Sequence, residues 1–429
     1  MSEGKKLVPR LRFPEFQKAG DWTTEKLGAM ASISTEKAGN AACVPMSITS
    51  GVGLVSQEEK FGRVIAGSSY KNYLLLKPKD FAYNKSATKD YPEGFLALYS
   101  GSTLAAVPNS IFTCFSVVGE SPVVTYLNYL FLGNLHGQWL RKFIQVGARA
   151  HGSLSITDSD LMALPVPLPT GDSSVAEQQK IADCLSSLDD LIAAQARKVD
   201  ALNTHKRGLM QQLLPDEDET QPRWRLPEFE TAAGWEVKKL EDLAKRGSGH
   251  TPSKSHPEYY GGGIKWISLA DSKRLDAGLI SDSQTEISAR GIKNSSAVVH
   301  PAGTVLISRD AGVGKSAVMA VPMAVSQHFI VWTCHAHLLS NWFLYYLLQK
   351  MKPVFERAAT GSTIKTIGLP FFKELHIAVP ALPEQQRVAD CLRALDALIT
   401  TAIQELEILR THKKGLMQQL FPAAEDVVA

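Results

Sequence analysis

Apolar residues recur at alternating spacings of three and four in two long stretches of the chain, residues 177–214 and 384–422. This spacing puts them on one stripe of a helix with a period near 3.5 residues, which is typical of helices that pair with other helices. The stripes comprise Leu185, Leu188, Ile192, Val199, Leu202, Leu209 and Leu213, and then Leu392, Leu395, Ile399, Ala402, Leu406, Leu409, Leu416 and Leu420. Pro215 and Pro422 end the two stretches, so the pattern predicts two long helices.

The two predicted helices are near-copies of each other. Residues 177–185 (EQQKIADCL) return 207 positions later as residues 384–392 (EQQRVADCL). Residues 204–213 (THKRGLMQQL) return at the same offset as residues 411–420 (THKKGLMQQL). Such self-similarity indicates a duplicated architecture.

A second repeated piece precedes each helix at a distance. Residues 9–16 (PRLRFPEF) return 213 positions later as residues 222–229 (PRWRLPEF). The blocks between the repeated pieces, residues 28–168 and 241–375, differ strongly in sequence. A repeated frame that carries two divergent blocks implies one task performed on two different targets.

The apolar stripes favour pairing of the two helices with each other, and antiparallel pairing would give the halves a pseudo-twofold relation. Lys206 and Lys413 interrupt the stripes at equivalent positions, and Gln195 interrupts the first. Such polar residues either fix the register of the pair or extend their heads to solvent at its edge. The pattern therefore predicts two divergent blocks separated by two long helices that form an antiparallel coiled coil.

The repeat also predicts the domain boundaries. We expect residues 1–170 to form the first frame segment and the domain of the first divergent block, 171–215 the first long helix, 216–378 the second frame segment and the domain of the second divergent block, 379–422 the second long helix, and 423–429 a tail.

Composition narrows the class of protein only modestly. The net charge is +3, but residues 245–374 hold 15 Lys and Arg against 8 Asp and Glu, an excess that suits either a nucleic-acid-binding or a merely solvated surface. The five cysteines are far apart and form no C-x-x-C pair, which favours buried, reduced thiols over disulfides or a zinc site. With no secretory signal and no apolar stretch of membrane-spanning length, we expect a cytoplasmic protein.

No catalytic motif is recognisable in the sequence. Residues 312–316 (GVGKS) look like the end of a phosphate-binding loop, but Arg309 stands where that motif requires its first glycine. The absence of a recognisable catalytic motif favours a binding protein over an enzyme.

Several segments resemble the specificity subunits of type I restriction–modification systems, and the resemblance covers essentially the whole chain. The repeated Glu-Gln-Gln helix starts carry it, together with five segments of the second block and one of the first. These are residues 249–253 (GHTPS), 259–262 (YYGG), 264–267 (IKWI), 303–308 (GTVLIS) and 312–315 (GVGK), and residues 79–85 (KDFAYNK).

The resemblance implies an α/β (α+β) fold with two target-recognition domains, separated by two long helices that form an antiparallel coiled coil. It also implies a DNA-binding specificity subunit that is not itself an enzyme. Each recognition domain would read one half of a bipartite site in double-stranded DNA, with unspecified base pairs between the halves. Two methyltransferase subunits would methylate adenine, and restriction or motor subunits would join for cleavage. S-adenosylmethionine, ATP and Mg²⁺ are expected on those partners, with no cofactor or metal on this chain.

Candidate DNA contacts are polar and basic residues of the two blocks, because base edges and phosphates are bound by such side chains. Each could equally be a solvated surface residue, and Trp266 is expected to pack in a core strand. The candidates are Lys71, Asn72, Tyr83, Asn84, Lys85, Lys89, Arg149, His151 and Ser153 in the first block, and Ser253, Lys254, Tyr259, Tyr260, Lys273, Arg309, Lys315, Ser362 and Lys365 in the second.

Two other functions fit the repeated frame. A structural adaptor could hold two different proteins through its divergent blocks, and an enzyme could have an unrecognised site. The basic excess of the second block favours DNA binding.

Overall fold

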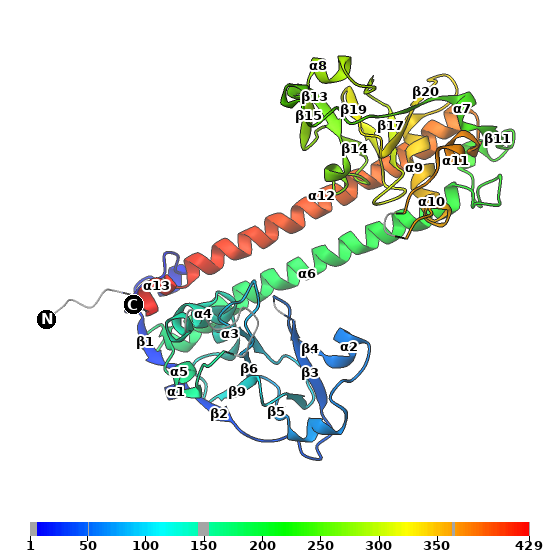
Figure 1. Ribbon diagram of the computed structural model, residues 1–429. Helices are drawn as coiled ribbons and strands as arrows, with labels where there is room; N and C mark the ends of the chain where they lie inside the picture. Colours follow the sequence, from blue (N-terminus) through cyan, green and yellow to red (C-terminus); the bar gives the residue numbers. More distant parts are fainter. Residues whose placement is uncertain (1–6, 50, 145–153, 363–364, 429) are drawn as a thin grey trace. The chain divides into compact units, whose positions relative to one another are not determined.

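The computed structural model describes residues 7–49, 51–144, 154–362 and 365–428 (Figure 1). Contacts divide the chain into two compact units, Met1–Ala194 with Leu406–Ala429, and Gln195–Glu405. Both units combine helices and sheets, as an α+β fold does. No helix among the described residues is long and apolar enough to cross a membrane.

The two predicted long helices are present. They are α6 (Ser174–Leu213) and α12 (Leu382–Leu420), with 40 and 39 residues. The first begins at Ser174, between the start of the apolar pattern at residue 177 and the predicted domain boundary at residue 171. Each helix is shared by both units.

Contacts inside each unit confirm the antiparallel pairing. In the second unit, the amine of Lys206 lies 2.5 Å from Asp396, and the amine of Lys198 lies 3.4 Å from Glu405. The residue numbers rise along α6 as those of its partners fall along α12, so the two helices are antiparallel. In the first unit, Lys413 lies 2.5 Å from Asp189. The lysines that interrupt the apolar stripes therefore bind aspartates of the opposite helix.

Each unit has its own hydrophobic core, built partly from the start of one long helix and the end of the other. In the first unit Leu185 of α6 and Leu420 of α12 share a core with the recognition domain. In the second unit Leu392 of α12 and Leu213 of α6 do the same. Burial of these apolar ends stabilises the antiparallel arrangement.

The repeated frame folds the same way twice. A two-stranded antiparallel ladder closes each recognition domain, and a short 3₁₀ helix precedes it. Arg12 of the first copy pairs with Glu177, the first Glu of α6, and Arg225 pairs with the equivalent Glu384 of α12. The frame elements are η1 (Pro14–Phe16), β1 (Thr23–Lys26) and β10 (Pro165–Leu168), and η4 (Pro227–Phe229), β11 (Glu236–Lys239) and β21 (His376–Val379).

The first recognition domain has two four-stranded sheets, ordered β2-β9-β6-β7 and β4-β3-β8-β5. In the second sheet β3 and β8 are parallel, and the other pairs are antiparallel. The strands are β2 (Ala31–Ser34), β3 (Val44–Thr49), β4 (Gly53–Ser56), β5 (Leu74–Leu76), β6 (Phe81–Asn84), β7 (Phe95–Leu98), β8 (Ala105–Val107) and β9 (Phe112–Val117).

The second recognition domain repeats this plan, although its sequence differs. Its sheets are ordered β12-β20-β17-β18-β14 and β15-β13-β19-β16, with β13 parallel to β19 as β3 is to β8. The strands are β12 (Ala244–Ser248), β13 (Tyr260–Ile267), β14 (Leu279–Ile280), β15 (Thr285–Ile287), β16 (Val299–His300), β17 (Val305–Ser308), β18 (Ser316–Met319), β19 (Met323–Val325) and β20 (Phe329–Cys334).

Short helices complete both domains. In the first domain they are α1 (Leu27–Met30), α2 (Gln57–Phe61), η2 (Gly67–Asn72), α3 (Val124–Leu132), α4 (Leu135–Leu140), η3 (Arg141–Phe143), α5 (Asp158–Met162) and α13 (Ala424–Val428). In the second they are α7 (Leu240–Leu243), η5 (Pro257–Tyr259), η6 (Leu269–Asp271), α8 (Ala289–Lys293), α9 (Asn341–Lys350), α10 (Lys352–Ala358) and α11 (Leu369–Lys373).

All five cysteines are free, as predicted, but only Cys114 is fully buried. The other four are partly exposed, so the expectation of buried thiols was wrong for them.

Candidate nucleic-acid interface

Both recognition domains place a basic residue at the end of an equivalent strand. β6 leads into Lys85, and β17 leads into Arg309 (Figure 1). In each domain the carbonyl oxygen of this residue accepts a hydrogen bond from a later segment, from Leu154 N at 2.6 Å and from Ile367 N at 2.9 Å. The two predicted contacts Lys85 and Arg309 therefore occupy matching positions in domains of different sequence.

The side chains of these two residues make polar contacts within the protein but remain partly exposed. The amine of Lys85 lies 3.3 Å from the carboxylate of Asp158. The guanidinium of Arg309 donates to the carbonyl oxygen of Ile367 at 3.1 Å. About a fifth of each side chain is exposed, 21% for Lys85 and 20% for Arg309, so both charges still reach the surface.

Two residues of the first domain that were predicted to contact DNA are buried in the structure, so the prediction is wrong for them. Tyr83 is fully buried in β6, where its hydroxyl donates to the carbonyl oxygen of Glu93 at 2.6 Å. Burial also raises the pKa of the Tyr83 hydroxyl. Asn84 is buried as well, and its side-chain oxygen accepts a hydrogen bond from Ser86 N at 3.0 Å. Both residues serve the fold rather than a surface.

The other predicted residues of the first domain do not form one group. Lys71 and Asn72 are exposed in η2, and Lys89 is exposed in the turn after β6. The remaining candidates, Arg149, His151 and Ser153, lie outside the described residues.

In the second domain, the loop before β13 presents polar and aromatic groups. Ser253 and Lys254 are exposed there. The ring of Tyr259 stacks on that of His256, with centroids 4.7 Å apart. Tyr260 instead donates its hydroxyl to the carbonyl oxygen of Pro252 at 2.6 Å, which closes the loop.

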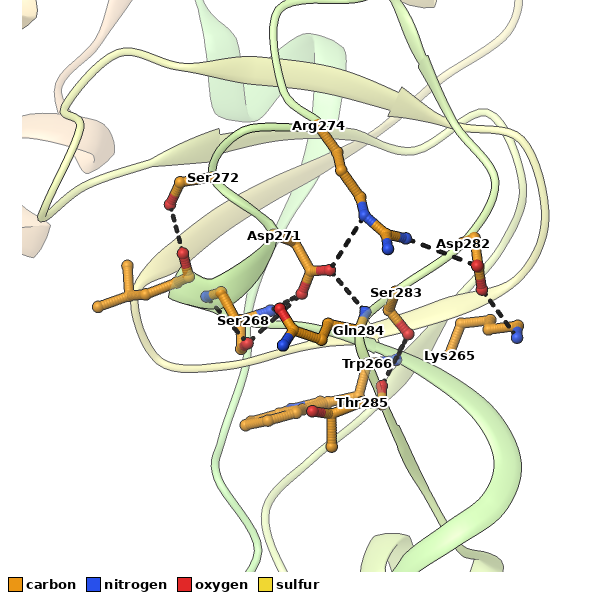
Figure 2. Close-up of polar contacts among 12 residues, drawn as sticks. Lys265, Trp266, Ser268, Asp271, Ser272, Arg274, Asp282, Ser283, Gln284 and Thr285 are labelled. Carbon is orange, nitrogen blue, oxygen red and sulfur yellow. Dashed lines mark hydrogen bonds and ion pairs between the residues drawn. The ribbon is translucent and has the colours of Figure 1, made fainter. Parts of the chain in front are cut away.

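The neighbouring loop, residues 268–285, is organised around a buried carboxylate (Figure 2). Asp271 is fully buried and accepts hydrogen bonds from Ser268 N at 3.0 Å and Gln284 N at 2.7 Å. Figure 2 also shows Asp282 between Arg274 and Lys265. The hydrogen bond from Lys265 lowers the pKa of Asp282.

This polar network fixes the backbone on either side of Lys273, which is exposed. Trp266, at the base of the same loop, is buried in β13, as predicted.

The false phosphate-binding loop is a hairpin between the antiparallel strands β17 and β18. Lys315 donates to the carbonyl oxygen of Ser272 at 3.0 Å, which ties the hairpin to the organised loop. A phosphate-binding loop leads into a helix, whereas this hairpin leads into a strand. The rejection of nucleotide binding from the sequence therefore agrees with the local fold.

The structure brings two predicted residues, Lys315 and Lys365, to one hollow at this hairpin. Lys352 at the start of α10 lines the same hollow, and sequence reasoning missed it. No motif marks Lys352, because only the packing of α10 against the hairpin brings it there. Ser362 is exposed three residues before Lys365.

Comparison with known proteins identifies the class to which this fold belongs. A type I restriction–modification S subunit from M. genitalium has a TM-score of 0.58 at 14% identity, covering 97% of this chain and 100% of that chain. A structure described as the basis of complex assembly and conformational transition of the type I R-M system also has a TM-score of 0.58, at 17% identity, covering 94% and 98%. The fold is therefore that of a type I specificity subunit.

Sequence relatives agree with the fold. Residues 233–408 match the type I restriction modification DNA specificity domain. The MjaIX specificity subunit of Methanocaldococcus jannaschii is 31% identical over 206 residues, 46% of this chain and 48% of that protein. The putative MjaX specificity subunit of the same organism is 27% identical over 298 residues, 69% of this chain and 66% of that protein.

The match spans about half to two thirds of the length of these curated relatives. The matching curated relatives are type I restriction enzyme specificity subunits, and residues 233–408 match the type I DNA specificity domain, so the predicted resemblance is confirmed. The alternative of a structural adaptor is not favoured.

Proposed function

We propose that the chain is the DNA-reading subunit of a type I restriction–modification complex. Each recognition domain reads one half of a bipartite site in double-stranded DNA. Two methyltransferase subunits then methylate adenine at the site, and restriction or motor subunits join for cleavage. The observation that carries this proposal is the matching placement of Lys85 and Arg309 at equivalent strand ends of two domains that differ in sequence.

The chemistry in this proposal belongs to the partners. This chain supplies base and phosphate contacts, while S-adenosylmethionine, ATP and Mg²⁺ are held by the other subunits. The division of labour is testable by calorimetry and a methylation assay. The purified chain is expected to bind no S-adenosylmethionine and to methylate no DNA. After methyltransferase subunits are added, the mixture should bind S-adenosylmethionine and methylate DNA.

The genomic methylation pattern of the host tests the recognition function. A strain with the gene should carry methylated adenines in one bipartite sequence, and deletion of the gene should remove that pattern alone. An unchanged pattern after deletion would contradict the proposal.

A further inference from the structure

Three lysines from different parts of the second recognition domain converge on one hollow. It has a volume of about 470 Å³ and lies between the β17–β18 hairpin and α10. Lys315 comes from the hairpin, Lys352 from the start of α10, and Lys365 from the segment before α11. Glu356 is the one acidic residue among the described residues that line the hollow, so cationic groups outnumber it three to one.

Glycine at the hairpin allows this convergence. Gly314 has a φ of +83°, in the left-handed region that favours glycine. A Cβ atom on Gly314 would lie 2.9 Å from Cγ of Lys352, closer than such atoms pack. The hairpin can therefore approach α10 only because residue 314 has no side chain.

The three lysine amines differ in the contacts that they make with the protein. Lys315 donates to the carbonyl oxygen of Ser272 at 3.0 Å, and an ammonium group has two further hydrogens for a ligand. Lys352 lies 3.5 Å from the carboxylate of Asp276, which also accepts hydrogen bonds from Ser316 N and Gln349. Lys365 is exposed. The lysines that line the hollow therefore still offer N–H donors and positive charge to an anion.

We propose that this hollow binds one phosphate group of the DNA backbone and so positions the second recognition domain on its half-site. The inference rests on the proposed DNA-binding function. Amines contact phosphates without reading the base sequence, which makes this a positioning site rather than a base-reading site. A free nucleotide has the same phosphate chemistry, but a nucleotide-binding loop leads directly into a helix, whereas this hairpin leads into strand β18.

The test compares the full-length protein with the double variant Lys352→Ala/Lys365→Ala. Binding to a mixed-sequence 30-base-pair duplex is measured by fluorescence anisotropy over a range of salt concentrations. Loss of one phosphate contact should weaken binding and reduce the slope of log Kd against log salt by about 0.9. Lys315 stays unchanged, because its amine also holds the loop at Ser272.

A matched control is the double variant Lys293→Ala/Lys373→Ala. Both residues are exposed in the same unit, and their loss changes the net charge equally. An equal drop in slope in the control, or no drop in the test variant, would overturn the inference. Circular dichroism checks folding, and the single variant Lys365→Gln, at an exposed position, provides the same test if the double variant unfolds.

Two further results separate the possible failures. Calorimetry with ATP and with inorganic phosphate should show no binding in the micromolar range. Binding of either that disappears in the double variant would assign the hollow to a free anion and overturn the DNA assignment. If the unaltered protein binds no DNA, alone or with methyltransferase subunits, the proposed function itself fails.

Discussion

One buried ion pair joins the two repeated pieces of the frame in each half. The guanidinium of Arg12 donates two hydrogen bonds of 2.7 Å to Glu177, and that of Arg225 donates bonds of 2.9 and 2.6 Å to Glu384. The Glu177 and Glu384 side chains are only 1% and 2% exposed. Without its arginine, either carboxylate would be buried with no opposite charge, although Glu384 would keep a hydrogen bond of 3.1 Å from Trp235 Nε1.

The variant Arg225→Ala is therefore expected to lower the free energy of unfolding by about 3–5 kcal/mol, the usual effect of removing one partner of a buried pair. Urea denaturation measures the change. Arg223→Ala is the control, because Arg223 and its partner Asp216 are largely exposed, at 63% and 38%. That loss should stay below about 1 kcal/mol. Equal losses in the two variants would show that burial of Glu384 is not the cause.

His136 gives the first unit a dependence on pH. It is almost fully buried, and desolvation lowers its pKa from 6.5 to about 4. Below pH 6.5 the unfolded chain binds a proton at this residue that the folded chain does not, so stability falls as the pH drops toward 4. The difference is on the order of 3 kcal/mol over that range.

The variant His136→Phe should remove this part of the pH dependence, because its ring fills a similar volume and cannot be protonated. Urea denaturation between pH 7 and pH 4 measures both proteins. A pH dependence as steep in the variant as in the unaltered protein would show that other groups cause it.

At the residue scale, the sequence did not show which candidate DNA contacts are buried. Lys85, Arg309 and Lys315 are partly exposed, and their contacts with DNA stay a prediction. Tyr83 and Asn84 are buried, because all four positions of β6 are covered. A single sequence does not show that β6 is covered on both faces. The Arg12–Glu177 pair could have been found, since both residues recur in the second copy.

At the scale of elements, the two long helices are joined by the same three-residue contact in each unit. Lys206 binds Asp396 at 2.5 Å, and Tyr346 donates to the other oxygen of that carboxylate at 2.6 Å. Burial raises the pKa of the Tyr346 hydroxyl, so it remains a donor. The equivalent contact in the first unit consists of Lys413, Asp189 and Tyr129.

A double-mutant cycle with Lys206→Met and Asp396→Leu tests this contact. Each single change leaves a half-buried charge without its partner, whereas the double change leaves an apolar pair on the helix stripe. The double variant should therefore lose less stability than the two single variants together, with a coupling energy of about 1–2 kcal/mol by urea denaturation.

The pair of Lys198 and Glu405 joins the same two helices and is the natural comparison. Both side chains are about half exposed, at 56% and 49%. Its coupling energy should be below about 1 kcal/mol. A coupling there as large as that of Lys206 and Asp396 would mean that burial and the tyrosine add nothing.

Long helices were easier to predict than short elements, and the reason is physical. A helix of 39 residues can repeat its apolar spacing at many positions, whereas the strands of the recognition domains have two to eight residues. The aromatic-rich helix α3, for example, begins at Val124. Its N-terminus is held by Gln178 of α6, a tertiary contact that local sequence does not reveal.

At the scale of the whole molecule, the frame presents both recognition domains through the same backbone geometry. In each half, one backbone hydrogen bond of 2.8 Å joins the two ends of the divergent block. It runs from Leu27 N to Leu164 O in the first half and from Leu240 N to Leu375 O in the second. The ladders beside these points pair over four residues in each half. The first interchangeable block therefore ends at Leu164, four residues earlier than the sequence suggested.

This equivalence predicts that one recognition domain can replace the other. In the proposed chimera, residues 241–375 take the place of residues 28–164, and the β1–β10 ladder, α6 and α12 remain. Tyr346 would then occupy the place of Tyr129 beside Asp189, because both tyrosines bind the equivalent aspartate. The frame contacts are thus kept, and the chimera is expected to fold cooperatively by circular dichroism.

The recognition sequence of this chimera is the decisive measurement. If each domain reads its half-site independently, methylation mapping should find a bipartite site in which the second half-site is unchanged and the first now has the same bases. An altered second half-site would mean that the domains read DNA jointly. Retention of the original first half-site would place its recognition in the frame, because the chimera keeps only frame residues from the first half.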